Sequence, residues 1–149
     1  MVDESPRLET LTLEECLLLL RAGRVGRIAT VVNDAPHIIP VNYQLVDTAE
    51  RNWIALRSRP GGVLDQTPAK VAFEIDGADP TTRRGWSVLV RGTLLPVDPD
   101  AAEFRDRFDP QPWMAPERDA WLVIEPFAIS GRRLHNADSD WPFAIDGHV

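Results

Sequence analysis

Three short segments of the chain carry side chains suited to holding a polar ligand. Residues 40–43 (Pro-Val-Asn-Tyr) present an amide and a phenol in a strand-like run. Residues 56–64 present a cation and a hydroxyl, and then a Gly-Gly turn whose backbone N–H groups could receive an anion. Residues 85–92 carry an aromatic ring, a hydroxyl and a cation on one predicted strand. Each segment alone is more simply explained as a turn or a core strand, so the prediction of a site depends on their combination.

Motifs for other chemistries are missing from the sequence. The histidines at positions 37, 135 and 148 show no metal-ligand spacing, and the single cysteine, Cys16, excludes a Cys-cluster metal site. There is no nucleophile elbow, Walker loop or dinucleotide-binding glycine motif. The acidic residues within positions 74–79 are predicted to form a solvated rim at a strand end. The sequence therefore gives no indication of a metalloenzyme, a hydrolase, a P-loop enzyme or a Rossmann-type dehydrogenase.

The composition is that of one globular domain. The chain has 149 residues, of which 44% are hydrophobic and 26% charged, so we expect one domain over residues 1–149, with residues 1–8 and 136–149 flexible or peripheral. A net charge of −7 argues against a nucleic-acid or anionic-membrane partner, which would require a basic surface. No apolar run approaches the roughly 20 residues of a membrane span. Because the first residues are acidic, unlike a signal peptide, we expect a cytoplasmic protein.

Two helices are predicted. Thr12 and Glu15 form a capping box, so the first helix should run to about Ala22, with Gly23 as its left-handed C-terminal residue. Asp98 is predicted to cap a second helix, with Phe104 and Phe108 on its apolar side. The predicted apolar stripe of the first helix consists of Leu13, Cys16, Leu17 and Leu20.

The rest of the chain is predicted to be β-structure. Six or seven strands follow one another through short connections, such as the Asn33-Asp34 turn pair. Parallel strands need crossovers of a dozen or more residues, so the sheet should be antiparallel. We therefore predict an antiparallel β-barrel with a helix at its mouth. The predicted strands are residues 27–32, 36–43, 53–58, 70–76, 85–97, 120–125 and 128–134.

Several predicted strands are apolar on both faces. Trp86, Val88 and Val90 share one face of their strand, while Leu89 lies on the other, and the adjacent isoleucines within residues 36–43 point in opposite directions. A small barrel needs only its inner face to be apolar. The outer apolar residues therefore predict a partner, and a homodimer is the simplest one.

Together and in this order, the segments resemble the FMN-binding split-barrel family, the relatives of pyridoxamine-phosphate oxidase. The resemblance covers most of the chain and also includes the first helix (residues 13–20), residues 26–30 (Gly-Arg-Ile-Ala-Thr) and residues 129–133 (Ile-Ser-Gly-Arg-Arg). It is greatest to a bacterial branch that includes nitroimidazole-reductase-like proteins and flavin or deazaflavin oxidoreductases. The resemblance implies a mainly β fold, a six- to seven-stranded antiparallel split barrel.

The resemblance also implies a homodimer with two cofactor sites, each built where the subunits meet. In the family, the strands matching residues 40–43 and 56–58 hold the flavin ring, and the turn that follows holds its phosphate. The partner subunit contributes the strand matching residues 86–88. Carried over to this chain, the cofactor contacts are Val41, Asn42, Arg57, Ser58, Gly61, Gly62, Trp86 and Ser87.

The phosphate turn departs from the family pattern. The family usually carries a Thr-Lys pair where this chain has Gly62 and Val63. Loss of the lysine removes a charge-assisted bond to phosphate, typically worth about 1.5–3 kcal/mol. We therefore expect a weaker grip on the phosphate, for which Arg57 or Arg59 could compensate.

The resemblance implies an FMN-dependent oxidoreductase that transfers a hydride to or from a small planar substrate. The cofactor would carry the chemistry, and Arg57 would supply positive charge beside it. A first alternative keeps the fold and replaces FMN with a deazaflavin coenzyme that acts as a diffusible hydride carrier. A second alternative is a non-catalytic dimer that binds a flavin or haem.

Overall fold

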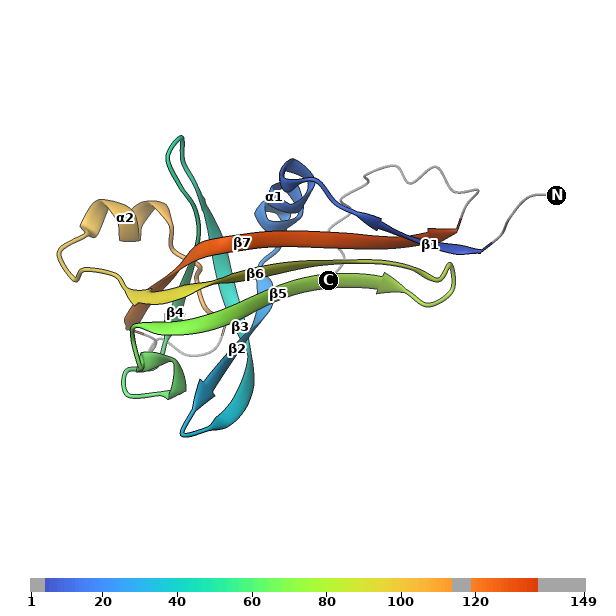
Figure 1. The fold of residues 1–149 in the computed structure, drawn as a ribbon. Helices are drawn as coiled ribbons and strands as arrows, with labels where there is room; N and C mark the ends of the chain where they lie inside the picture. The colour runs from blue at the N-terminus through green and yellow to red at the C-terminus, as the bar shows by residue number, and fades with distance from the viewer. Residues whose placement is uncertain (1–4, 114–118, 137–149) are drawn as a thin grey trace.

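The chain folds as a split barrel. The computed structural model describes residues 5–113 and 119–136, and in this part of the chain seven antiparallel strands form one sheet. The sheet closes on itself because β7 pairs with both β4 and β6 (Figure 1). The predicted antiparallel split barrel is thereby confirmed. The elements are β1 (Pro6–Thr10), α1 (Leu13–Ala22), β2 (Val25–Val32), β3 (Ala35–Asp47), β4 (Asn52–Ser58), the 3-10 turn η1 (Val63–Asp65), β5 (Ala69–Asp79), β6 (Arg84–Pro96), α2 (Ala102–Arg107) and β7 (Ala120–Asn136).

One bulged strand replaces two predicted ones. Arg91 of β6 opposes Ala128 of β7, whereas its neighbour Gly92 opposes Pro126, so Phe127 is an extra residue on β7. A proline cannot donate to a strand ladder, but it is tolerated at a bulge. The sequence prediction of separate strands on either side of Pro126 was therefore wrong.

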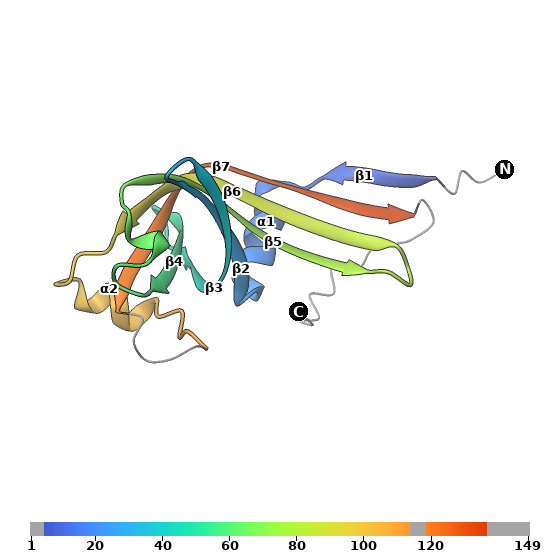
Figure 2. The same cartoon turned by 90° about the horizontal axis from the view of Figure 1, so that it is seen from below.

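The sheet continues beyond the barrel as an arm. β1 pairs with the last residues of β7, and the β5–β6 hairpin extends beside them, away from α2 (Figures 1 and 2). The Glu9 carboxylate on β1 accepts two hydrogen bonds from Arg133 of β7, at 2.8 and 2.7 Å, and lies 2.9 Å from Nε2 of His135. β1 lies at the periphery of the sheet, and its formation from residues 6–10 was not predicted. The tail from residue 137 onward lies outside the described residues.

Helix α1 begins and ends where the sequence predicts. The Thr12 hydroxyl accepts the N–H of Glu15 at 3.2 Å, and the helix ends at Ala22. Its buried side chains are Cys16, Leu19 and Leu20, whereas Leu13 is 53% exposed. The apolar face is therefore rotated from the predicted stripe. Among the described residues, no helix is long and apolar enough to cross a bilayer.

Gly23 ends α1 for a reason other than the predicted one. Its backbone is extended (φ −78°, ψ 164°) and not left-handed. A Cβ at this position would lie 2.2 Å from the Tyr43 hydroxyl oxygen. That hydroxyl is buried and donates to the Leu20 carbonyl at 2.8 Å, which ties α1 to β3. Glycine is therefore required by the close approach of Tyr43.

The main core fills the barrel. Tyr43 and Phe73 are both 0% exposed and meet edge to face, with ring centroids 4.9 Å apart. Around them pack buried side chains from α1 and the barrel strands, including Leu20, Ile28, Leu56, Val88, Val90 and Ile124. The predicted alternation of β5 and β6 is confirmed, since Val88 and Val90 point into this core.

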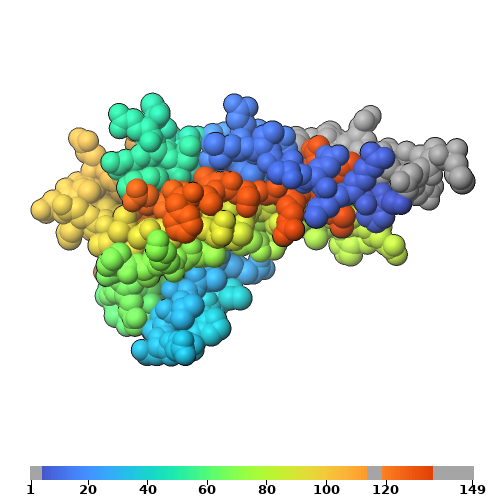
Figure 3. Space-filling model, in the orientation of Figure 1, coloured from blue at the N-terminus to red at the C-terminus, as the bar shows by residue number. Residues whose placement is uncertain are grey.

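A second apolar cluster lies on the outside of the barrel under α2. Phe108 is buried against Val46, Ala55 and Val123, which belong to β3, β4 and β7. Figure 3 shows the gold α2 region beside the teal turn between β3 and β4, at one end of the molecule. Asp98 caps the turn before the helix and not the helix itself, which begins at Ala102. The outer face of these strands is therefore covered by the chain's own α2 region.

Candidate functional site

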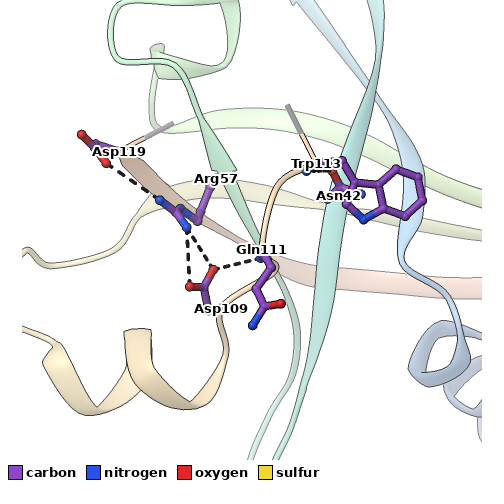
Figure 4. A network of polar contacts seen from close by, with 6 residues as sticks. All are labelled: Asn42, Arg57, Asp109, Gln111, Trp113 and Asp119. Carbon is purple, nitrogen blue, oxygen red and sulfur yellow. Dashed lines mark hydrogen bonds and ion pairs between the residues drawn. The ribbon is translucent and has the colours of Figure 1, made fainter. Parts of the chain in front are cut away.

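Two predicted site residues lie on the outer face of neighbouring strands, β3 and β4. The β3–β4 ladder ends at the pair Tyr43 and Leu56, and Asn42 and Arg57 are the next residues of the two strands beyond that pair. Tyr43 and Leu56 point into the core, so side chains one position away point outward. Both side chains therefore leave the outer face of the sheet, and each contacts the segment that follows α2, Arg57 through Asp109 and Asn42 through Trp113 (Figure 4).

The Arg57 guanidinium is enclosed by acidic and aromatic groups. It donates to the Asp109 carboxylate at 3.1 and 3.5 Å and lies 3.8 Å from Asp119 (Figure 4). It also stands 4.8 Å from the centre of the Trp121 ring, and Arg105 stands 5.4 Å from the same ring. The Arg57 side chain is only 17% exposed. Partial burial makes this ion pair stronger than one at an open surface.

Asn42 holds the same stretch of chain at its other end. Its Oδ1 accepts the backbone N–H of Trp113 at 2.9 Å (Figure 4), and its Nδ2 donates to the Arg24 carbonyl at 3.4 Å. Gln44, also pointing outward from β3, donates to the Arg107 carbonyl at 3.3 Å. Residues 107–113, which we call the strap, are thus bound to polar side chains of both β3 and β4.

Two predicted contacts point the other way. Val41 is 6% exposed and belongs to the main core, and Ser58 is 5% exposed on the same face of β4 as Leu56. A ligand on the outer face could therefore reach only the main chain of these residues.

The predicted anion-binding turn is formed, but its donors are engaged. Gly61 adopts a left-handed conformation (φ 74°), and its N–H donates to the Asp65 carboxylate at 2.6 Å. The N–H of Gly62 donates to the Arg59 carbonyl at 3.0 Å. An anion could take the Gly61 donor only by replacing Asp65.

Trp86 and Ser87 lie away from the other site residues. They belong to β6, and both β2 and β5 stand between β6 and β3 in the barrel. With strands about 4.8 Å apart, this places Ser87 about 14 Å from Asn42 around the barrel. The Trp86 indole covers Gly77 on β5, where a Cβ would lie 2.7 Å from its Nε1. A single chain therefore does not bring Trp86 and Ser87 to Asn42 and Arg57.

The groups at the site suit a flavin, but all of them are engaged within the chain. The Asn42 amide carries both a donor and an acceptor, which suit the polar edge of a flat heterocycle, and Arg57 carries a cation. In this conformation the Asn42 amide is bonded to backbone groups and Arg57 to a carboxylate of the same chain. The turn at Gly61 and Gly62 likewise uses its N–H groups internally. The residues present therefore fit a flavin in their chemistry, and a bound flavin would have to replace these internal bonds.

Nothing in the sequence predicts the strap. Asp109 lies 52 residues from Arg57, and Trp113 lies 71 residues from Asn42. No periodicity or spacing marks such pairs. The one local signal is an acidic residue between Phe108 and Pro110, directly after a short amphipathic helix.

A carboxylate pair on β5 provides a pH-dependent test of the structure. Burial, together with the neighbouring Asp76 carboxylate, raises the pKa of Glu74 from 4.5 to about 7. Between these values the folded chain binds the proton more tightly than the unfolded chain, so stability falls as pH rises. Glu74→Gln should therefore raise Tm more at pH 8 than at pH 4.5. Glu50→Gln, at the exposed β3–β4 turn, is the charge-matched control, and equal Tm shifts in both variants would contradict the raised pKa of Glu74.

No three His, Cys, Asp or Glu side chains gather as a metal site within residues 5–113 and 119–136.

The fold is that of a split barrel, the class that includes flavin-binding proteins. β6 pairs with β7 to close the sheet, α1 packs against the barrel, and Asn42 and Arg57 point outward from β3 and β4. The chain belongs to the pyridoxamine 5′-phosphate oxidase family, whose family model matches residues 12–133. It is 33% identical over 139 residues to the uncharacterized protein Rv0080 of Mycobacterium tuberculosis, covering 87% of this chain and 86% of that protein.

Solved structures agree with this assignment. The FAD-binding protein from Mycobacterium smegmatis is 29% identical, with a TM-score of 0.64 over 85% of this chain and 98% of that one. A FAD-binding protein from Mesorhizobium loti shares the fold, at 23% identity and a TM-score of 0.68 over 87% of this chain and 98% of that one.

Proposed function

We propose that the chain is a flavin-dependent oxidoreductase, with FMN as the cofactor and a small planar molecule as the substrate. The observation that carries the proposal is that Asn42 and Arg57 point outward from adjacent strands, each one position beyond the last β3–β4 pair, Tyr43 and Leu56. Membership of the pyridoxamine 5′-phosphate oxidase family supports it, as does the 29% identity to a FAD-binding protein. We also place the protein in the cytoplasm as part of this proposal.

The chain's residues would bind and orient the cofactor. Asn42 would hold the polar edge of the ring, and Arg57, which also stacks on Trp121, would supply positive charge for the anionic group of the cofactor. The main chain at Val41 and Ser58 would line the same surface. A bound flavin supplies hydride-transfer chemistry that no side chain can supply.

A homodimer would complete the site. Val31 and Ile38 point outward from the β2–β3 hairpin and are 66% and 71% exposed, as expected of apolar residues that a second copy would cover. The partner subunit would bring its own Trp86 and Ser87 to the ring, since one chain holds them three strands away from Asn42.

A second candidate is a deazaflavin coenzyme that binds and leaves as a hydride carrier. The observation that favours it is the turn at Gly61 and Gly62, which lacks the family's lysine and engages its own N–H groups. Weak binding of the phosphate suits a coenzyme that dissociates after each turnover.

Titration of the purified protein with FMN, FAD and a deazaflavin coenzyme tests these proposals. We expect FMN to bind most tightly and Arg57→Met to weaken it at least ten-fold, about the value of one charge-assisted bond. Arg51→Met, at the exposed β3–β4 turn, is the matched control and should change affinity less than two-fold. Tighter deazaflavin binding would favour the second candidate. A colourless protein that binds none of the three cofactors would contradict both candidate functions.

A further inference from the structure

Arg57 already holds a carboxylate at the place where a ligand's negative charge would be expected. Asp109 contacts it at 3.1 Å, with side-chain exposures of 17% for Arg57 and 33% for Asp109. A partly buried arginine favours an anionic partner, and here that partner is a carboxylate of the same chain.

Asp109 is held in place by the strap itself. Its Oδ1 also accepts the N–H of Gln111 at 2.9 Å, and the strap then reaches Asn42 through the N–H of Trp113. Gln111 has a φ of 47°, in the left-handed region that a residue with a side chain enters unfavourably. Phe108 anchors the start of the strap in the second apolar cluster, and beyond it the strap is held to β3 and β4 by the bonds of Asp109 to Arg57 and of Trp113 to Asn42.

The glycine turn repeats the arrangement. There the Asp65 carboxylate accepts the Gly61 N–H at 2.6 Å, so both predicted anion donors carry an aspartate of the same chain. Two separate segments thus place a carboxylate on a donor that the resemblance assigns to the cofactor.

We propose that Asp109 stands in for the anionic group of the ligand and that the strap must release Arg57 before a charged flavin binds. The inference builds on the proposed function and adds a self-blocked state to it. Because only the released fraction can bind, the strap lowers the apparent affinity for phosphate-bearing flavins below the intrinsic value. Asp109 is a positioning residue that sets this threshold and does not act on the substrate.

Asp109→Asn tests the exchange of anions. The variant keeps the shape of the side chain and removes its charge, so we expect FMN to bind about ten-fold more tightly. Riboflavin, which lacks the phosphate, should change less than two-fold. Asp119→Asn is the matched control, because Asp119 lies farther from Arg57, at 3.8 Å, and its side chain is 77% exposed. An equal gain for FMN and riboflavin, or no gain for FMN, would overturn the proposal.

A second measurement uses the wild-type protein and does not depend on how the variant folds. Amide hydrogen exchange at Trp113 should become faster when FMN is added, because its N–H loses the Asn42 acceptor when the strap leaves the sheet. Slower exchange would show that the strap stays in place when FMN binds and would overturn the proposal that it releases Arg57.

Tm measurements with added inorganic phosphate distinguish failure of this inference from failure of the proposed function. If no flavin binds, the proposed function fails, but phosphate should still raise the Tm of Asp109→Asn more than that of the wild type. Equal Tm shifts in the two proteins would overturn the anion exchange as well.

Discussion

Replacing Gly92 with alanine is expected to lower the free energy of unfolding by about 3 kcal/mol, the upper end of the usual range for overpacking. An added Cβ would lie 2.4 Å from the Glu125 carbonyl oxygen and 2.8 Å from Cγ2 of Ile124. The nearer atom belongs to the backbone of β7, which cannot rotate away. Relief would require β6 and β7 to separate at the bulge where the barrel closes. Urea denaturation followed by circular dichroism measures the loss.

Gly85→Ala on the same strand is the matched control for this prediction. Its Cβ would lie 3.2 Å from the Gly77 carbonyl oxygen, a contact that a shift of a few tenths of an ångström relieves. Both substitutions stiffen the unfolded chain alike, so the difference between them isolates the close approach at the bulge. Similar losses in the two variants would mean that β6 and β7 do not meet as described around Pro126.

The sequence predicts those parts of the fold that local patterns determine. Asn33 and Asp34 take φ values of 51° and 65°, the conformation of a two-residue hairpin turn that such residue types favour. Phe73 and Ile75 point inward on β5 because alternation fixes the faces of a strand. Pro126 misled the prediction because a proline that ends a strand and one that sits at a bulge look the same in the sequence.

The candidate site was predictable only in part. Family resemblance selected Asn42 and Arg57, which lie on adjacent strands one position beyond the last β3–β4 pair. The resemblance could not predict that Asp109 pairs with Arg57, because an ion pair between residues 52 positions apart depends on how α2 packs on the outside of the barrel. That packing arises from Phe104 and Phe108, whose apolar side chains the sequence shows without showing which surface they cover.

Leu20→Ala is expected to destabilise the protein by about 2–5 kcal/mol, the usual range for removing a fully buried leucine. Leu20 is 0% exposed and belongs to the main core of the barrel. Its removal leaves a cavity at the helix, where Cys16 and Tyr43 are also fully or almost fully buried. The Tyr43 hydroxyl holds the Leu20 carbonyl, which limits how far α1 can move to fill the space. The loss should therefore fall in the upper half of the range.

Leu18→Ala provides the comparison that gives this value its meaning. Leu18 lies on the same helix and is 42% exposed, and alanine is the better helix former, so the expected change is within about 0.5 kcal/mol. The two substitutions remove the same atoms from nearby positions of one helix and differ mainly in what those atoms contact. If Leu13→Ala proved as costly as Leu20→Ala, the helix would instead pack through the stripe that the sequence predicts, to which both leucines belong. α1 would then present a different face to β3, and the position of Tyr43, next to Asn42 in the candidate site, would have to change with it.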